Sequence, residues 1–120
     1  MTGKTDLVRS YFEAYRTGDR SVVEAALAQD FTFTSPYDDA IDRNAYFERC
    51  WPSRDLFRSI EVERICEQGG DVFVLYRCET RDGNAFRNME LHRFRGDRLL
   101  GVEVFFGATR KDGVFAPQRR

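Results

Sequence analysis

The sequence is poor in the residues that bind metals and form disulfides. It contains one histidine and three cysteines, and no two of Cys50, Cys66 and Cys78 have the spacing of a zinc site. An odd cysteine count without that spacing favours free thiols in a reducing compartment, which predicts a cytoplasmic location. We expect neither a metal nor an organic cofactor.

Long hydrophobic runs and an excess of one charge are also lacking. The N-terminal stretch MTGKTDLVRSYF has no apolar run fit for a signal peptide, and no segment approaches membrane-spanning length. The 19 basic and 20 acidic residues leave a net charge of −1, and no basic stripe is interleaved with aromatic residues. The sequence therefore predicts a partner that is neither a membrane nor a nucleic acid.

Aromatic residues are plentiful, with eleven Phe, five Tyr and one Trp, which suits a core or cavity walled by rings. The 120 residues predict a single domain, 1–120, long enough to bury about two-thirds of the surface of the unfolded chain. Residues 108–120 are expected to form a frayed C-terminal tail.

Apolar residues at helical spacing predict the helices. Three are expected, over residues 6–17, 20–28 and 43–51. Thr5 or Asp6 is placed to cap the first, Asp19 the second and Asp42 the third, and Gly18 supplies a left-handed stop after the first.

Alternating residues and turn signals predict the strands. Expected are a short strand at 31–34, a turn at 35–39, strands at 57–67 and 72–80, and a final hairpin over 84–107 that turns at 95–98. Helices therefore precede an antiparallel meander, an order typical of an α+β fold with helices on one face of a curved sheet.

The first strand of the final hairpin carries unusual polar residues. Because residues two apart share a face, one face holds Phe86, Asn88, Glu90, His92 and Phe94. A carboxylate and an amide among aromatic residues indicate a site. His92 lies near the strand end, where a partly exposed hydrogen-bonding role is the more common one.

The partners of these residues depend on the turns. A two-residue turn at Asp82-Gly83 places Arg77 opposite Asn88, and Arg77, Glu79, Asn88 and Glu90 then form one polar cluster. The opposite face is more apolar, and it could be the core instead, with the cluster in solvent. A one-residue change in the turn would exchange the two faces, so the sequence leaves both interpretations open, a buried polar cluster and a solvent-exposed one.

The turn at 95–98 leaves a second alternative. A two-residue loop places Glu103 beside Glu90, whereas a three-residue loop places Val102, Val104 and Phe106 beside it.

Four segments resemble the NTF2-like superfamily, and most of all its SnoaL-like, ketosteroid-isomerase-like branch. They are Thr17-Gly18-Asp19, FTFTSPYDD, DRNAYF and FRGDRLLGVEVFFG, and the resemblance covers nearly the whole chain. It implies a cone-shaped α+β barrel in which a strongly curved, mainly antiparallel sheet wraps N-terminal helices around a pocket. It also implies a homodimer through the outer sheet face, with the polar cluster in the pocket and Val72, Val74 and Tyr76 at the interface.

The resemblance also implies roles for single residues. Glu90 falls where ketosteroid isomerases keep a protonated carboxylic acid as an oxyanion donor, and Tyr11 or Tyr15 falls near their oxyanion tyrosine. Ser35 replaces the catalytic base of those enzymes, so steroid isomerase activity is not expected.

Limonene-epoxide hydrolases offer a second match. Arg77 and Glu79 resemble an Arg-x-Asp pair of those enzymes, while Val104 replaces their water-activating aspartate.

We expect an apolar small molecule as the partner. Glu90 would act as acid or base, Arg77 would hold Glu79 ionised, and Asn88 would orient the substrate. The remaining expected contacts are Tyr11, Tyr15, Phe33, Ser35, Trp51, Val104 and Phe106. Asp38 and Asp39 are interpreted as turn residues near the pocket mouth.

Three functional hypotheses remain open. The first is cofactor-independent acid/base catalysis on an apolar carbonyl or hydroxyl compound, in the class of isomerases, cyclases, dehydratases or epoxide hydrolases. The second is a noncatalytic binder of an apolar ligand. The third is a dimerisation module with a vestigial pocket.

Overall fold

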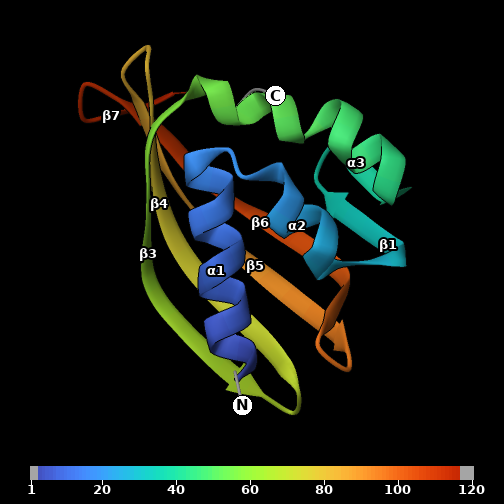
Figure 1. Ribbon diagram of the computed structural model, residues 1–120. Coiled ribbons are helices and arrows are strands. Elements are labelled where there is room, and N and C mark those ends of the chain that lie inside the picture. The colour runs from blue at the N-terminus through green and yellow to red at the C-terminus, as the bar shows by residue number, and fades with distance from the viewer. Residues whose placement is uncertain (1–2, 117–120) are drawn as a thin grey trace.

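Helices cover one face of a strongly curved sheet in the computed structural model, which describes residues 3–116 (Figure 1). The elements in chain order are α1 (Lys4–Thr17), α2 (Arg20–Ala26), β1 (Leu27–Ser35), β2 (Asp38–Asp42), α3 (Arg43–Arg49), the 3-10 helix η1 (Trp51–Leu56), β3 (Phe57–Gln68), β4 (Asp71–Thr80), β5 (Asn84–Arg95), β6 (Arg98–Lys111) and β7 (Val114–Ala116). The predicted α+β class, with helices before a meander, is confirmed.

The sheet is mixed and open. Its strand order is β2-β1-β6-β5-β4-β3, with β7 paired to β6. Strands β3 to β6 pair antiparallel, whereas β1 runs parallel to β6. The edge strands β2 and β3 do not pair with each other, so the closed barrel implied by the resemblance is not formed. The curved sheet instead wraps around α1, which lies across its concave face (Figure 1).

The predictions for the first helix were partly correct. Helix α1 buries Val8, Tyr11 and Phe12, and Gly18 ends it at φ 81° as predicted. Its predicted cap is wrong, because the helix begins at Lys4 and no side chain caps it. Among residues 3–116, no helix combines the length and hydropathy needed to cross a bilayer.

Asp42 caps α3 as predicted, since its Oδ1 accepts a hydrogen bond from Ala45 N at 2.9 Å. Asp19 precedes α2, but its carboxylate accepts from the Ser21 hydroxyl and caps no backbone N–H.

The second and third helices end earlier than predicted. Leu27 already opens β1, and α3 ends at Arg49. The chain then forms η1, whose first turn contains Pro52, because the fixed φ of proline suits the start of a helical turn.

The C-terminal segment is ordered over 108–116, which corrects the expected tail. Strand β6 continues to Lys111, and β7 folds back onto it through a turn in which Asp112 and Gly113 have positive φ. The rest of the expected tail, 117–120, lies outside the described residues.

Strands β4 and β5 pair one residue away from the predicted register. Tyr76 lies opposite Asn88, and Arg77 lies opposite Arg87. The turn is longer than two residues: Gly83 N donates to Thr80 O, and the Thr80 hydroxyl accepts from Asn84 N. Because side chains alternate between the two faces of a sheet, this one-residue shift exchanges the faces of β4 relative to β5. Tyr76 replaces Arg77 on the face that carries Asn88.

The inner face of β4 is therefore the apolar one. Val72, Val74, Tyr76 and Cys78 are buried and share that face with Asn88, Glu90 and His92 of β5. The expectation that Val72, Val74 and Tyr76 form a dimer interface is wrong, since they belong to the core.

The β5–β6 turn combines features of both alternatives. Arg95 pairs with Arg98 across a two-residue turn, but a bulge next to Arg93 then shifts the register by one residue. Val104 consequently lies opposite Glu90, as a longer loop would have placed it, and Glu103 lies opposite Leu91.

Candidate functional site

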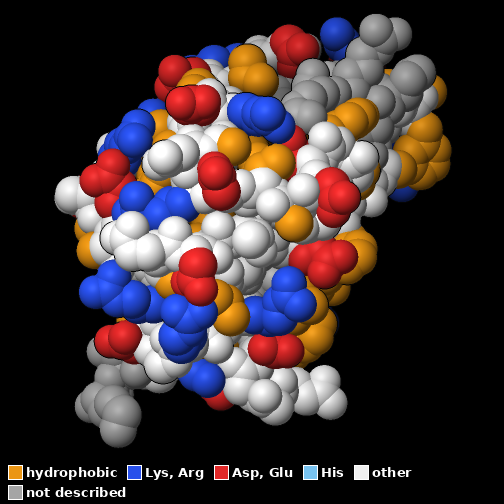
Figure 2. Space-filling view, turned by 90° about the vertical axis from the view of Figure 1, so that its right-hand side faces the viewer, with side chains coloured by type: hydrophobic (Ala, Val, Ile, Leu, Met, Phe, Trp, Pro, Cys, Tyr) orange, Lys and Arg blue, Asp and Glu red, His pale blue; other side chains and the backbone are white. Residues whose placement is uncertain are grey.

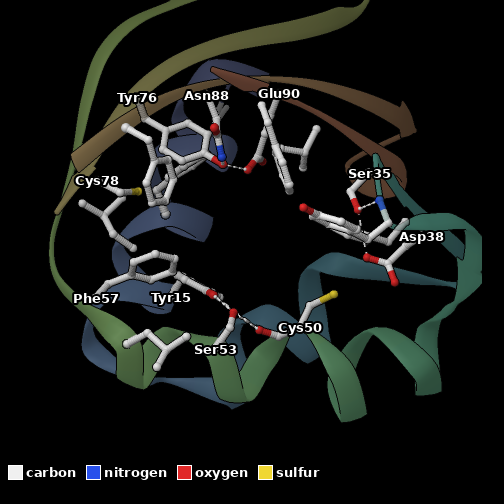
Figure 3. A pocket seen from close by; sticks show the side chains of 18 of the residues that line it. Tyr15, Ser35, Asp38, Cys50, Ser53, Phe57, Tyr76, Cys78, Asn88 and Glu90 are labelled. Carbon is white, nitrogen blue, oxygen red and sulfur yellow. Dashed lines mark hydrogen bonds between the residues drawn. The ribbon is translucent and has the colours of Figure 1, made fainter. Parts of the chain in front are cut away.

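A cavity of about 270 Å³ lies between the concave sheet face and the helices (Figure 3). Most predicted site residues line it. They are Tyr11, Tyr15, Phe33, Ser35, Asn88, Glu90, Val104 and Phe106. Residues from α1, β1, β5 and β6 thus meet at one site, which explains why the aromatic content is high.

Three predicted site residues lie elsewhere. Arg77 and Glu79 point to the outer face, where Arg77 Nη1 donates to Glu79 Oε1 at 2.7 Å and Arg58 also contacts the carboxylate. These bonds hold the pKa of the Glu79 carboxyl below its ordinary value. The predicted pair exists, but the one-residue register shift removes it from the cavity.

Trp51 is half-buried beside the cavity and does not line it. Its ring packs against those of Tyr15 and Phe47, at centroid distances of 5.5 and 6.1 Å. Its role in the structure is helix-end packing.

Glu90 receives a directed chain of hydrogen bonds. Gly107 N donates to Asn88 Oδ1 at 3.2 Å. Asn88 Nδ2 donates to Tyr76 Oη at 3.2 Å, and Tyr76 Oη donates to Glu90 Oε2 at 2.5 Å (Figure 3). The backbone N–H fixes which end of the Asn88 amide faces Tyr76, and so it fixes the direction of each later bond. Glu90 is therefore held by the sheet itself.

Tyr76 is the residue that the sequence placed on the wrong face. Burial raises its pKa well above 10.0, and the Glu90 carboxylate adds to this, so the hydroxyl keeps its proton and remains a donor. The register of the structure puts Tyr76 beside Asn88 and Glu90, and the apolar pattern of its β4 face was the signal that favoured this register.

His92 is completely buried, which corrects the expectation of a partly exposed side chain. Its Nε2 lies 2.9 Å from Glu90 Oε1, but the ring N–H is not aligned for a hydrogen bond. The imidazole packs against the rings of Tyr11 and Phe12. It lies behind Glu90 and does not line the cavity.

Two tyrosine hydroxyls meet on the helical side. Tyr11 of α1 and Tyr46 of α3 share a hydrogen bond between their hydroxyls, and burial raises the pKa of both well above 10.0. The pair holds two protons, of which one lies between the oxygens, so the other can be donated to a ligand. The sequence missed Tyr46 because its position on the α3 stripe predicts packing alone.

Asp38 provides a second carboxyl in the cavity, which corrects its interpretation as a turn residue. Its side chain is 4% exposed, and Arg49 Nη1 lies 3.9 Å from its Oδ1. Ser35 Oγ donates to Oδ2 at 2.9 Å and accepts from Tyr37 N at 3.1 Å. Ser35 thus orients a carboxyl on the β1–β2 side of the cavity, to the right of Glu90 in Figure 3.

The cavity also contains thiols. Cys50 and Cys78 line it, and no disulfide joins the cysteines, as predicted. Burial raises the pKa of Cys78 to about 12, so this thiol stays neutral. Within residues 3–116, no three His, Cys, Asp or Glu side chains are grouped to hold a metal ion.

The buried tyrosines and Cys78 predict that the protein loses stability in alkali. Burial raises the pKa of Tyr11, Tyr15, Tyr46 and Tyr76 above 10.0 and that of Cys78 from 9.0 to about 12. As the pH rises above about 9, the unfolded chain loses these protons while the folded chain keeps them. The free energy of unfolding therefore falls, by up to about 1.4 kcal/mol per pH unit for each group.

Urea denaturation followed by circular dichroism, repeated between about pH 8 and pH 11, measures this decline. Tyr15→Phe removes one titrating group, so its decline should be shallower by up to about 1.4 kcal/mol per pH unit. Equal free energies of unfolding across this range would contradict the prediction.

Solved structures share the fold at low sequence identity. An NTF2-like protein of unknown function from Cytophaga hutchinsonii is 20% identical, with a TM-score of 0.77 over 88% of this chain and 91% of the other. An NTF2-like protein of unknown function from Burkholderia pseudomallei is 21% identical, with a TM-score of 0.72 over 88% and 92%.

A de novo designed protein with a curved β-sheet is also similar, at 13% identity and a TM-score of 0.76 over 88% of both chains. A designed chain with this shape shows that the fold alone does not imply an activity. Among curated proteins, none matches this sequence. Residues 8–102 match the family model of the SnoaL-like domain, and the chain therefore belongs to the SnoaL-like domain family.

Proposed function

We propose that this protein binds a compact, mainly apolar carbonyl or hydroxyl compound and transfers a proton on it with Glu90. The observation that carries the proposal is Glu90, a residue that is 8% exposed in the cavity wall and whose carboxyl is held at Oε2 by Tyr76. A buried, oriented carboxyl in an apolar cavity is the arrangement that general acid–base catalysis needs.

The size of the cavity supports a small ligand. Its volume of about 270 Å³ equals that of about nine waters at ~30 Å³ each, and it lies just below the roughly 300–1,000 Å³ of typical ligand sites. Aromatic side chains from α1, β1 and β6 form much of its wall. A one- or two-ring compound fits these dimensions and this lining.

The polar groups suit proton transfer next to a carbonyl. Glu90 would accept the proton from the adjacent carbon and return it, while the hydroxyl pair of Tyr11 and Tyr46 would donate to the carbonyl oxygen as charge develops there. Asp38 would contact a second polar group or supply the base from the β2 side of the cavity. Ser35 has the role of orienting it.

The test uses 2-tetralone, a two-ring ketone with exchangeable protons beside its carbonyl. Nuclear magnetic resonance in deuterium oxide measures deuterium incorporation at that carbon, and fluorescence of Trp51 measures binding. We expect incorporation above the buffer rate. The carboxylate 2-naphthoate should bind at least about tenfold more weakly, because two side-chain carboxyls line the cavity and the guanidinium in its lining, that of Arg49, already faces Asp38. Binding without exchange would leave a noncatalytic binder, and absence of both would overturn the proposal.

We further propose a homodimer through the outer sheet face. Met89 and Phe105 pair across β5 and β6 and are 40% and 51% exposed. On the side of the molecule seen in Figure 2, acidic and basic side chains are mixed, and hydrophobic side chains gather along the right-hand margin. A contiguous apolar patch exposed on an outer face is typical of an interface.

Sedimentation velocity tests the dimer. The wild-type chain should sediment as a dimer, and Phe105→Glu should sediment as a monomer because it places a charge in the contact. A wild-type monomer would remove the proposed interface.

A further inference from the structure

The only histidine of the chain occupies an unusual position. His92 has no exposed surface, and neither ring nitrogen has a hydrogen-bond partner among residues 3–116. Buried polar atoms without partners are unfavourable, and an apolar side chain would fill a core position without that penalty. Packing alone therefore does not account for an imidazole here.

The contacts of Glu90 indicate what the imidazole faces. Glu90 Oε2 accepts from Tyr76, whose own acceptor site is taken by the Asn88 amide. The other oxygen, Oε1, is buried without a hydrogen bond and lies 2.9 Å from His92 Nε2. Oε2 is thus held as an acceptor by Tyr76, whereas Oε1 faces the imidazole without a hydrogen bond.

The remaining neighbours of the ring offer no competing partner. Tyr11 and Phe12 of α1 pack on it at centroid distances of 5.8 and 5.9 Å, and its cross-strand partners are Val72 on β4 and Val102 on β6. Of these neighbours only Tyr11 titrates, and burial raises its pKa well above 10.0, so it keeps its proton at neutral pH. Glu90, on the same strand, is the carboxyl beside the ring.

We propose that His92 is a positioning residue that shares the proton of Glu90, an inference that rests on the proposed function of that carboxyl. A carbon–hydrogen bond of the substrate breaks as an oxygen–hydrogen bond forms at Oε2 of Glu90, and the proton that Oε1 held passes to Nε2 of an imidazole whose own hydrogen is on Nδ1. This relay leaves the enolate, a neutral Glu90 acid and an imidazolium. The reverse transfers return the proton to carbon, so no other reactant is consumed.

His92→Gln tests this role. Glutamine can place an N–H near the position of Nε2 but cannot take up a proton. In the 2-tetralone exchange assay, kcat should fall by about 10- to 100-fold, the range seen when a group that holds a functional side chain is removed, with KM within about twofold. The pH–rate profile should change as well. In a Glu90→Gln background the same substitution should cause no further loss.

Val102→Ala is the matched control, because Val102 is buried opposite His92. It should lower stability but leave the shape of the pH–rate profile unchanged. A wild-type kcat in His92→Gln, or a full additional loss in the Glu90→Gln background, would overturn the inference.

A second measurement does not depend on activity. Selective ¹⁵N-histidine labelling gives the ring signals of a single residue, since the chain has no other histidine. These signals should shift between the wild type and Glu90→Gln, and identical spectra would overturn the inference. Shifted spectra from a protein without exchange activity would sustain the Glu90–His92 pairing while the proposed function fails.

Discussion

Glu90→Gln is expected to slow the exchange of 2-tetralone by about 10²- to 10⁴-fold, the usual contribution of a general acid or base. The glutamine oxygen can still accept the hydrogen bond from Tyr76, but the amide cannot take a proton at neutral pH. The effect should therefore fall on kcat, with binding of the ketone within about twofold of wild type. Initial exchange rates over a range of ketone concentrations separate the two constants.

Two further carboxyl-to-amide variants complete the experiment. Glu79→Gln removes a carboxyl that the sequence placed in the site and the structure places on the outer face, so its exchange rate should equal that of wild type. Asp38→Asn changes the other carboxyl of the cavity. If Asp38→Asn shows the larger loss and Glu90→Gln retains its rate, then Asp38 is the base and the role proposed for Glu90 is wrong.

Local signals in the sequence predicted most of the elements, although the side-chain caps expected for α1 and α2 do not form. The left-handed conformation of Gly18 and the cap from Asp42 depend on residues within one helical turn, and both are as predicted. The alternation of β5 placed Asn88 and Glu90 on one face, and both line the cavity. Period and capping are properties of a short stretch of chain, so the sequence alone can reveal them.

The register between β4 and β5 could not be predicted from a short stretch of chain in the same way. One additional residue in the 80–84 turn exchanges Arg77 for Tyr76 opposite Asn88, and the predicted ion pair becomes a tyrosine hydrogen bond. The short sequence Asp82-Gly83 fits turns of either length. The correct choice follows from burial of the apolar face of β4, which is a property of the whole core.

The place of Asp38 in the cavity is a second feature that the local sequence did not predict. Asp38 lies three positions after Ser35, a spacing that a turn hydrogen bond explains without any further role. Only the curvature of the sheet and the position of α3, which brings Arg49 near its carboxylate, place Asp38 in a cavity wall. The sequence therefore predicted one carboxyl of the site and missed the other.

Gly107→Ala is expected to lower the free energy of unfolding by about 2–4 kcal/mol. A Cβ at this position would overlap the backbone carbonyl oxygen of Arg87, which belongs to the neighbouring strand. Gly107 also lies where the pairing of β5 and β6 is irregular, and its N–H donates to Asn88 Oδ1. Relieving the overlap must move backbone, and that movement would break the first bond of the chain that leads to Glu90.

Gly101→Ala is the matched control in the same strand. Its Cβ would have ordinary contacts, with Arg93 Nη2 at 3.4 Å and Thr32 Oγ1 at 3.5 Å. Alanine there restricts the unfolded chain without a backbone clash, so a change of about 0.4–1 kcal/mol in the stabilising direction is expected. Thermal unfolding should place the two variants on opposite sides of wild type, with Gly107→Ala lower by on the order of 10 °C. Equal midpoints for the two variants would show that the close approach of Gly107 to Arg87 does not constrain the sheet, and that Asn88 is oriented by other contacts.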